Sequence, residues 1–163
     1  MISVEMQKAI NEQINKELYS SYLYLSMSAS ASALGFKGAA KWFKVQSVEE
    51  NGHAMKFYDY LVEQNAPVKL QAIKQPTSDF KGLPELFEGT HKHEQFVTQS
   101  IYELMALAKA EKDYASELLL QWFVKEQIEE EAHALEIVGQ LKMAGSSAGT
   151  QLMLDHQLGK RGG

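Results

Sequence analysis

Four glutamates of this sequence, Glu17, Glu50, Glu94 and Glu130, stand at positions where a helix would place apolar core residues. His53 follows Glu50 by three positions, and residues three or four apart share one face of a helix. Burying a single carboxylate costs on the order of several kcal/mol, and four buried together repel one another. No lysine or arginine occupies the inward helical faces at that level. The pattern therefore predicts metal ions between the carboxylates.

Each glutamate interrupts an otherwise apolar stripe near the middle of its own helical segment. The predicted inward residues are Ile10, Ile14, Glu17, Ser21 and Tyr24, then Phe43, Gln46, Glu50, His53, Phe57 and Tyr60, then Phe87, Thr90, Glu94, Val97, Ile101 and Leu104, and finally Leu119, Phe123, Glu126, Glu130, His133, Ile137 and Leu141. A bundle brings helix midpoints to one level, so we expect the four carboxylates to meet. The alternative is an ordinary bundle whose glutamates face solvent, which requires four midpoints to coincide by chance.

Helical periodicity predicts four long helices over residues 4–33, 38–65, 84–110 and 114–142, and a short fifth helix over 148–159. Pro84 is typical of a helix start, Asp113 of an N-cap, and Gly145 of a helix end. A helix as short as the fifth is not stable alone, so we expect it to gain order only by packing against neighbouring subunits.

The connections between these segments predict how the helices are arranged. The first and third are short, so the helices that they join should be antiparallel neighbours. Residues 66–83 contain two prolines and polar turn residues, and an extended chain spans about 3.3 Å per residue, enough to cross the length of a helix. The second and third helices can therefore run parallel. We predict an all-α, ferritin-like four-helix bundle over residues 4–142 with one long crossover loop.

Composition narrows the class of protein. With 163 residues and 45% hydrophobic content, the chain suits a single domain over 1–163. The absence of cysteine excludes disulfides, thiolate zinc sites and iron–sulfur clusters. A net charge of −5 without a basic cluster argues against nucleic acid as a partner, whereas cationic ligands are attracted. The chain shows neither a signal peptide nor a membrane-spanning apolar run, so we expect a soluble cytoplasmic protein without a membrane partner.

The two halves of the chain align with each other at an offset of 77 residues. At the level of the carboxylates this offset pairs Glu17 with Glu94, Glu49 with Glu126, Glu50 with Gln127, and His53 with Glu130. Di-metal sites in such bundles usually take a glutamate from two helices and Glu-x-x-His from each of the other two. The second half has Gln127 and Glu130 in place of that motif. The predicted centre is therefore asymmetric.

The asymmetry predicts two unequal metal positions. The first has Glu17, Glu50 and His53, and the second has Glu94, Glu130 and a share of Glu50 as a bridge. Carboxylates with an imidazole and open coordination positions suit Fe(II), and two such ions can bind dioxygen, although zinc or manganese could use the same ligands. The second position lacks a histidine, so its ion should leave more readily. This property suits a metal that is substrate rather than fixed cofactor.

Further acidic residues lie beside Glu130. Three glutamates on the same level could form a third, more exposed site: Glu49, Glu126 and Glu129. The alternative for these three is a solvated acidic face. The internal offset places His133 one turn away from the centre, and we do not expect it to be a ligand. His91 and His93 precede Glu94 on other faces and are predicted to lie on the surface.

Three stretches of the sequence resemble the prokaryotic non-haem ferritins: residues 17–24, 49–54 and 122–131, within a likeness that covers nearly the whole chain. The resemblance implies a hollow shell of twenty-four identical subunits. It implies iron storage, in which Fe(II) is oxidised by dioxygen or hydrogen peroxide at a di-iron ferroxidase centre inside each bundle. The ferric product is then kept as a mineral inside the shell, and the fifth helix lines a fourfold channel.

The resemblance also implies roles for individual residues. Glu17, Glu50 and His53 match the first iron position, and Glu94 and Glu130 match the second. Gln127 matches a family position that is a weak ligand or a neighbour of the ligands. Tyr24 matches a hydrogen-bonding residue that supplies an electron. A third iron position is matched by Glu49, Glu126 and Glu129.

Two departures from related patterns qualify this interpretation. Bacterioferritins carry a haem-ligating methionine between the glutamate and histidine of the second helix, where this chain has Asn51 and Gly52, so no haem is expected. The segment 28–33 alternates serine and alanine where relatives carry aromatic bulk, so its packing should differ. Two rival functions remain: a di-iron oxidase or peroxide-scavenging protein that retains its irons, and a structural cage with a vestigial site.

Overall fold

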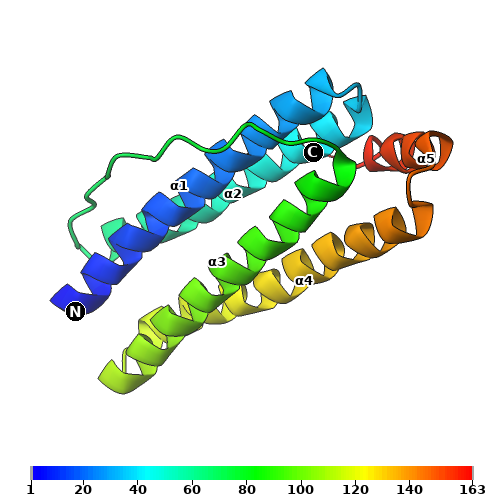
Figure 1. Cartoon of the computed structure of the whole chain (residues 1–163). Helices are drawn as coiled ribbons and strands as arrows, with labels where there is room; N and C mark the ends of the chain where they lie inside the picture. Colours follow the sequence, from blue (N-terminus) through cyan, green and yellow to red (C-terminus); the bar gives the residue numbers. More distant parts are fainter. Residues whose placement is uncertain (1, 163) are drawn as a thin grey trace.

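The computed structural model describes residues 2–162, and all regular structure within that range is helical (Figure 1). The helices are α1 (Val4–Ala33), α2 (Lys37–Glu63), α3 (Leu83–Glu111), α4 (Tyr114–Ala144) and α5 (Ala148–Leu158). α1 packs antiparallel to α2, and α3 packs antiparallel to α4 (Figure 1). The connection between the two pairs runs along α1, so α2 and α3 are parallel. The predicted ferritin-like bundle with one crossover is confirmed, and each predicted helix boundary lies within two residues of the observed one.

Side chains at the helix ends explain where the helices begin and end. Asp113 caps α4, because its Oδ1 accepts a hydrogen bond from the backbone N–H of Ser116 at 3.0 Å. Pro84 lies in the first turn of α3, where its missing N–H costs no helical hydrogen bond. Gly145 follows α4 with a positive φ of 57°, a conformation that favours glycine. The three end signals predicted from the sequence are therefore confirmed.

The hydrophobic core consists of two clusters on either side of a polar layer. One cluster includes Ile14, Phe57, Val97 and Phe123, and the other includes Leu23, Phe43, Phe87 and Val138. Each of the four predicted ligand glutamates lies in sequence between a residue of one cluster and a residue of the other. The polar layer is therefore closed off by apolar packing at both ends, which lowers its local dielectric constant.

The inward face of α4 differs from the predicted one. Gln127 and Ala134 are buried, whereas Glu126 is half-buried and His133 is exposed. The predicted stripe ran along one edge of the buried face of α4 and not along its middle. Charged residues adjoin both sides of that face, so the pattern did not show where its middle lies. The inward faces predicted for the second and third helices are confirmed, since every residue assigned to them is buried.

The crossover loop, residues 64–82, is fastened to α1 by side chains on the outer face of that helix. Asn11 donates through Nδ2 to the backbone oxygen of Pro67 at 3.0 Å and accepts at Oδ1 from the N–H of Lys69 at 2.6 Å. Farther along, Ser26 donates to the backbone oxygen of Thr77 at 2.7 Å. These bonds satisfy backbone groups of an extended segment that has no strand partner among the described residues.

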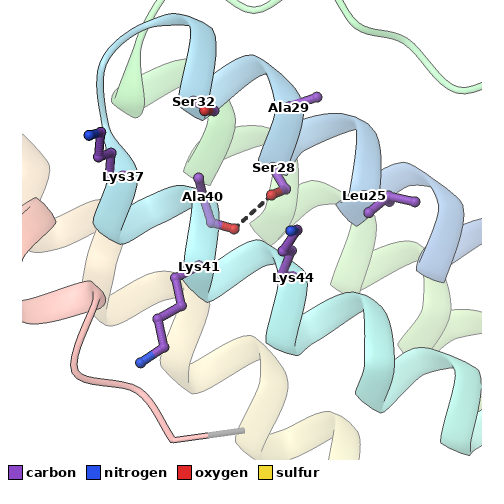
Figure 2. Close-up of a pocket in the computed structure, with 8 residues that line it drawn as sticks. All are labelled: Leu25, Ser28, Ala29, Ser32, Lys37, Ala40, Lys41 and Lys44. Atoms are coloured by element: carbon purple, nitrogen blue, oxygen red, sulfur yellow. Dashed lines mark hydrogen bonds between the residues drawn. The ribbon is translucent and has the colours of Figure 1, made fainter.

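The serine and alanine residues late in α1 leave a hollow on its side toward α2. Ser28 donates a hydrogen bond to the backbone oxygen of Ala40 at 2.7 Å, which binds the two helices directly (Figure 2). Next to this contact lies a cavity of about 630 Å³, whose lining from α2 includes Lys37, Lys41 and Lys44 (Figure 2). The serine and alanine residues are thus accommodated by one serine contact beside an open cavity, and α1 remains helical to Ala33.

The short helix α5 is bound to the start of α2 within the same chain. The Asp155 carboxylate, which is 8% exposed, accepts hydrogen bonds from the backbone N–H groups of Gly38 at 3.1 Å and Ala39 at 2.7 Å. Charge at a helix N-terminus and satisfaction of two free N–H groups both stabilise this contact. The expectation that α5 gains order only from neighbouring subunits is therefore wrong, because the chain itself supplies a docking site.

Candidate metal centre

The structure brings the five predicted metal ligands together in the polar layer. Two groups of three have ligand atoms that lie within 4.8 Å of one another: Glu17, Glu50 and His53, and Glu50, Glu94 and Glu130. All five side chains are buried, and Glu50 belongs to both groups. The Glu50 carboxylate therefore lies within reach of a cation in either group.

In the first group, Glu50 and His53 are adjacent on α2. The distance from Glu50 Oε2 to His53 Nδ1 is 3.2 Å, and the other ring nitrogen, Nε2, lies 3.8 Å from Oε1 of Glu126. The imidazole packs edge-on against Trp122 and Phe123, with ring centroids 5.5 and 5.9 Å away. These aromatic contacts from α4 fix the ring plane without using either nitrogen.

Glu17 completes the first group from α1. Its Oε1 accepts a hydrogen bond from Gln13 Nε2 at 2.8 Å, and the Gln13 carbonyl in turn accepts from Ser100 at 2.9 Å. Among the described residues, Glu17 Oε2 is the buried side-chain oxygen left without a hydrogen-bond partner. An unsatisfied buried carboxylate oxygen is costly, and a cation would satisfy it. This atom shows that the residues present fit a bound metal.

In the second group, Glu94 is held by two hydrogen-bond donors. The Tyr24 hydroxyl donates to Oε1, and Gln127 Nε2 donates to Oε2 at 3.1 Å. Gln127 also lies 3.3 Å from Oγ1 of Thr98, so its amide nitrogen faces α3. The resemblance implied a weak ligand or a neighbour of the ligands at Gln127, and in this structure its amide nitrogen donates to Glu94.

Burial sets the charge state of the carboxylates when no cation is bound. Desolvation, with the charge of Glu50 next in importance, raises the pKa of Glu17 to about 8. Desolvation also raises the pKa of Glu130 to about 7 and that of Glu94 to about 6. The pKa of Glu50 is raised too, by burial and then by the charges of Glu94 and Glu130. Protons therefore share the site near neutral pH, and an incoming cation must displace them.

Two further residues organise the site, and neither was predicted from the sequence to act there. Gln46 donates through Nε2 to Glu50 Oε1 at 3.0 Å and to Glu130 Oε2 at 2.8 Å, which links the carboxylates of α2 and α4. Arg161 donates through Nη1 to the Gln46 carbonyl oxygen at 2.8 Å. The expectation that no lysine or arginine occupies the inward helical faces at this level holds, and Arg161 reaches the level from beyond the last helix. Helical periodicity carries no signal for such a residue.

The predicted third site is not assembled. Glu49 is paired with Arg161 through a 2.5 Å contact, the Glu126 carboxylate faces His53, and Glu129 is exposed. Over residues 2–162, the groups close enough to share a metal ion contain none of these three glutamates. The three carboxylates lie near the di-metal groups without converging on one point.

His93 is not the surface residue that the sequence suggested. Its Nε2 lies 2.7 Å from Oγ of Ser20, and its ring packs edge-on against Tyr24 with centroids 5.8 Å apart. Burial lowers the pKa of His93 to about 4, so the ring is neutral at pH 7. The neutral His93 ring therefore packs against Tyr24 as an uncharged aromatic group. His91, two positions earlier, is half-exposed.

Comparison with known proteins shows what this chain and its fold are similar to. Residues 7–144 match the Ferritin-like domain family. The chain is 42% identical over 158 residues to a bacterial non-heme ferritin of Campylobacter jejuni, covering 97% of this chain and 95% of the relative. It is 44% identical to a bacterial non-heme ferritin of Bacteroides fragilis over 99% of this chain and 100% of the relative. Its structure resembles an open pore ferritin of Archaeoglobus fulgidus with a TM-score of 0.98 and 44% identity, covering 99% of this chain and 100% of that one.

Proposed function

The chain belongs to the ferritin family of iron-storage proteins, and we propose that it oxidises its substrate, Fe(II), at the centre formed by Glu17, Glu50, His53, Glu94 and Glu130. The observation that carries the proposal is the shared carboxylate. Glu50 belongs to both three-residue groups, so two ions can bind side by side with one bridge between them. Two adjacent one-electron donors match the two-electron reduction of an oxidant.

The proposed reaction balances with either oxidant. With dioxygen, two Fe(II) ions each lose one electron, and dioxygen takes up two electrons and two protons to leave as hydrogen peroxide. With hydrogen peroxide, the same two electrons and two protons give two molecules of water. Carboxyl groups with a raised pKa, such as that of Glu17, release protons when the cations bind.

The residues around the ligands have distinct proposed roles. Glu50 bridges, His53 and Glu17 hold the first ion, and Glu94 and Glu130 hold the second, which has no nitrogen ligand. A position bound by carboxylates alone holds Fe(II) less tightly than one with an imidazole, so its ion can move on to the mineral.

We propose that Tyr24 holds Glu94 in place beside the second ion through the hydrogen bond that its hydroxyl donates. Burial, followed by the negative charge of Glu94, raises the pKa of Tyr24 above its usual value, so the phenol keeps its proton in the resting protein.

The proposal also covers the oligomeric shell and the cellular location of the protein. Ferritin relatives and ferritin-fold structures support a homo-oligomeric shell, which we propose contains twenty-four subunits with α5 beside its fourfold channel. Over residues 2–162, no helix is long and apolar enough to cross a membrane.

We propose a cytoplasmic location and no nucleic-acid partner. The non-haem names of the relatives support the expectation that haem is not used.

One experiment separates this function from its rivals. Fe(II) is added in air in increasing amounts, and light scattering gives the mass in solution while the iron retained per chain is counted after gel filtration. Storage predicts a shell that retains far more iron than the ligand groups can bind. A di-iron oxidase or peroxide scavenger would stop near two irons per chain, and a vestigial cage would oxidise no faster than buffer. Either of the last two outcomes would refute the proposal.

A further inference from the structure

Arg161 lies beyond α5, and its side chain returns to α2 at the level of the metal centre. Its guanidinium carbon is 4.4 Å from the ring centroid of Trp42, and its side chain is 21% exposed. Stacking of a guanidinium on an indole is attractive and fixes the plane of the charged group. The positive charge is therefore held in one place rather than free in solvent.

The two ends of this guanidinium bind two different acceptors. Nη1 donates to Oε1 of Gln46 at 2.8 Å, and Nη2 lies 2.5 Å from Oε2 of Glu49. An arginine has donors only, so it binds Gln46 at the carbonyl oxygen and leaves the amide nitrogen on the opposite side. The two ends of a glutamine amide are nearly equal in size, and a neighbouring hydrogen bond decides which end faces the site.

The amide nitrogen of Gln46 lies on the side opposite Arg161 and faces the metal centre. Gln46 Nε2 donates to Glu50 at 3.0 Å and to Glu130 at 2.8 Å, and the Gln46 side chain is fully buried. If the amide were reversed, its carbonyl oxygen would face two carboxylates and repel them. The Arg161 bond therefore reinforces the orientation of Gln46 in which its inner end attracts the ligand carboxylates.

The same guanidinium also neutralises Glu49. A cavity of about 430 Å³ lies between α2 and α4, and its lining includes Glu49, His133, Glu136 and Arg161. One of its lining residues, Glu49, directly precedes the candidate ligand Glu50 on α2. A cation drawn to these acidic groups would have to compete with the guanidinium for Glu49 Oε2.

We propose that Arg161 is a positioning residue for the metal centre and an internal counterion that competes with a third metal cation at Glu49. The proposal rests on the proposed function only in assuming that the five buried ligands bind divalent cations. In each subunit the segment after α5 would then have two roles. Arg161 orients the bridge residue Glu50 through Gln46, and it limits tight binding to two cations.

Isothermal titration of the full-length protein with Zn²⁺ tests the counterion. Arg161→Gln should bind a third Zn²⁺ per chain about fivefold more tightly than the parent, the size expected for loss of one partly exposed ion pair. Arg161→Lys keeps the charge and should leave that third step weak. The matched control is Lys160→Gln, which removes the same charge from the neighbouring exposed position and should match the parent.

Absorption of Co²⁺ in the visible range tests the positioning role, because its bands report the ligand geometry directly. Both Arg161→Gln and Arg161→Lys should shift the bands of bound Co²⁺, since neither side chain reproduces the two-ended contact, whereas Lys160→Gln should not. Identical Zn²⁺ isotherms in Arg161→Gln and the parent would overturn the counterion role, and identical Co²⁺ spectra would overturn the positioning role. A parent that binds Zn²⁺ as expected but never oxidises Fe(II) would instead refute the proposed function.

Discussion

Asp155 in the last helix caps the N-terminus of α2 by accepting a hydrogen bond from the backbone N–H of Ala39 at 2.7 Å, across 116 residues of sequence. The contact depends on close approach at Gly38. A Cβ atom at this position would lie 1.7 Å from the backbone oxygen of Asp155. The absence of a side chain at Gly38 is therefore what lets α5 dock.

Gly38→Ala should displace α5 and remove the cap. Loss of such a capping carboxylate costs about 1 kcal/mol, and exposure of the docked face should add to this. Urea unfolding would measure the change, and limited proteolysis should cut the chain faster between residues 145 and 162. Gly52→Ala is the matched control, because nothing lies within 4 Å of its Cβ. That control should stabilise α2 by about 1 kcal/mol, and equal stability of the two variants would contradict the close approach.

Glu50→Ala should impair rapid Fe(II) oxidation more than His53→Ala. Glu50 belongs to both ligand groups, whereas His53 belongs to one. Since loss of a residue that merely supports a ligand costs about 10-fold to 100-fold, we expect a decrease of well over about 100-fold for Glu50→Ala and of about 100-fold for His53→Ala. Stopped-flow absorbance in air provides the measurement, with the exposed Glu12→Ala as the control. Unchanged rates in both ligand variants would remove the ferroxidase assignment.

The metal-free protein should lose stability as the pH rises from about 4.5 toward 8. Burial raises the pKa of Glu17 from 4.5 to about 8 and that of Glu130 to about 7. The folded state therefore binds more protons than the unfolded state across this window, so the stabilisation is fully present below pH 4.5 and is lost as the pH rises through the folded-state pKa values.

Thermal unfolding with a chelator at pH 5, 6, 7 and 8 would show this decline. Zn²⁺ should reverse it at pH 7 to 8, because the cation takes the place of the protons. Glu17→Gln, which is nearly the same size and cannot ionise, should flatten the pH dependence. A metal-free protein that becomes more stable over the same range would show that other groups dominate the titration.

Gln127→Glu should turn the second metal position into a retentive one. The Gln127 nitrogen now donates to Glu94 at 3.1 Å, and a carboxylate there would add negative charge next to that ligand. Attraction for the second ion rises, while the metal-free protein loses a hydrogen bond and gains like-charge repulsion.

We expect this variant to unfold more easily without metal, to keep two irons per chain after chelation, and to mineralise slowly after a normal first oxidation. Iron retained after chelation is the deciding measurement. Gln99→Glu, an exposed change of the same type on α3, is the control. Equal retention in Gln127→Glu and the parent would show that Gln127 does not control release.

The sequence by itself determined the helices and their order, and it predicted the five residues that the structure gathers as candidate ligands. Apolar spacing fixes which face of a helix is buried, and a charge on that face is conspicuous because burial makes it costly. Glu17, Glu50, His53, Glu94 and Glu130 were identified in this way, and the structure gathers them at one level. Caps such as Asp113 were readable for the same reason, since they act within a few residues of the sequence.

The tertiary structure alone decided how residues outside that periodic pattern contact the helices of the bundle. Asp155 reaches α2, and Arg161 reaches Gln46 and Glu49, from a segment that has no periodic relation to these partners. The phase of α4 was also settled only by packing, since charged residues adjoin both edges of its buried face and only contact with α3 selects Gln127 rather than Glu126 as the inner residue. Local patterns record which face of a helix is buried, whereas contacts between distant segments depend on loop paths and close approaches that no local pattern encodes.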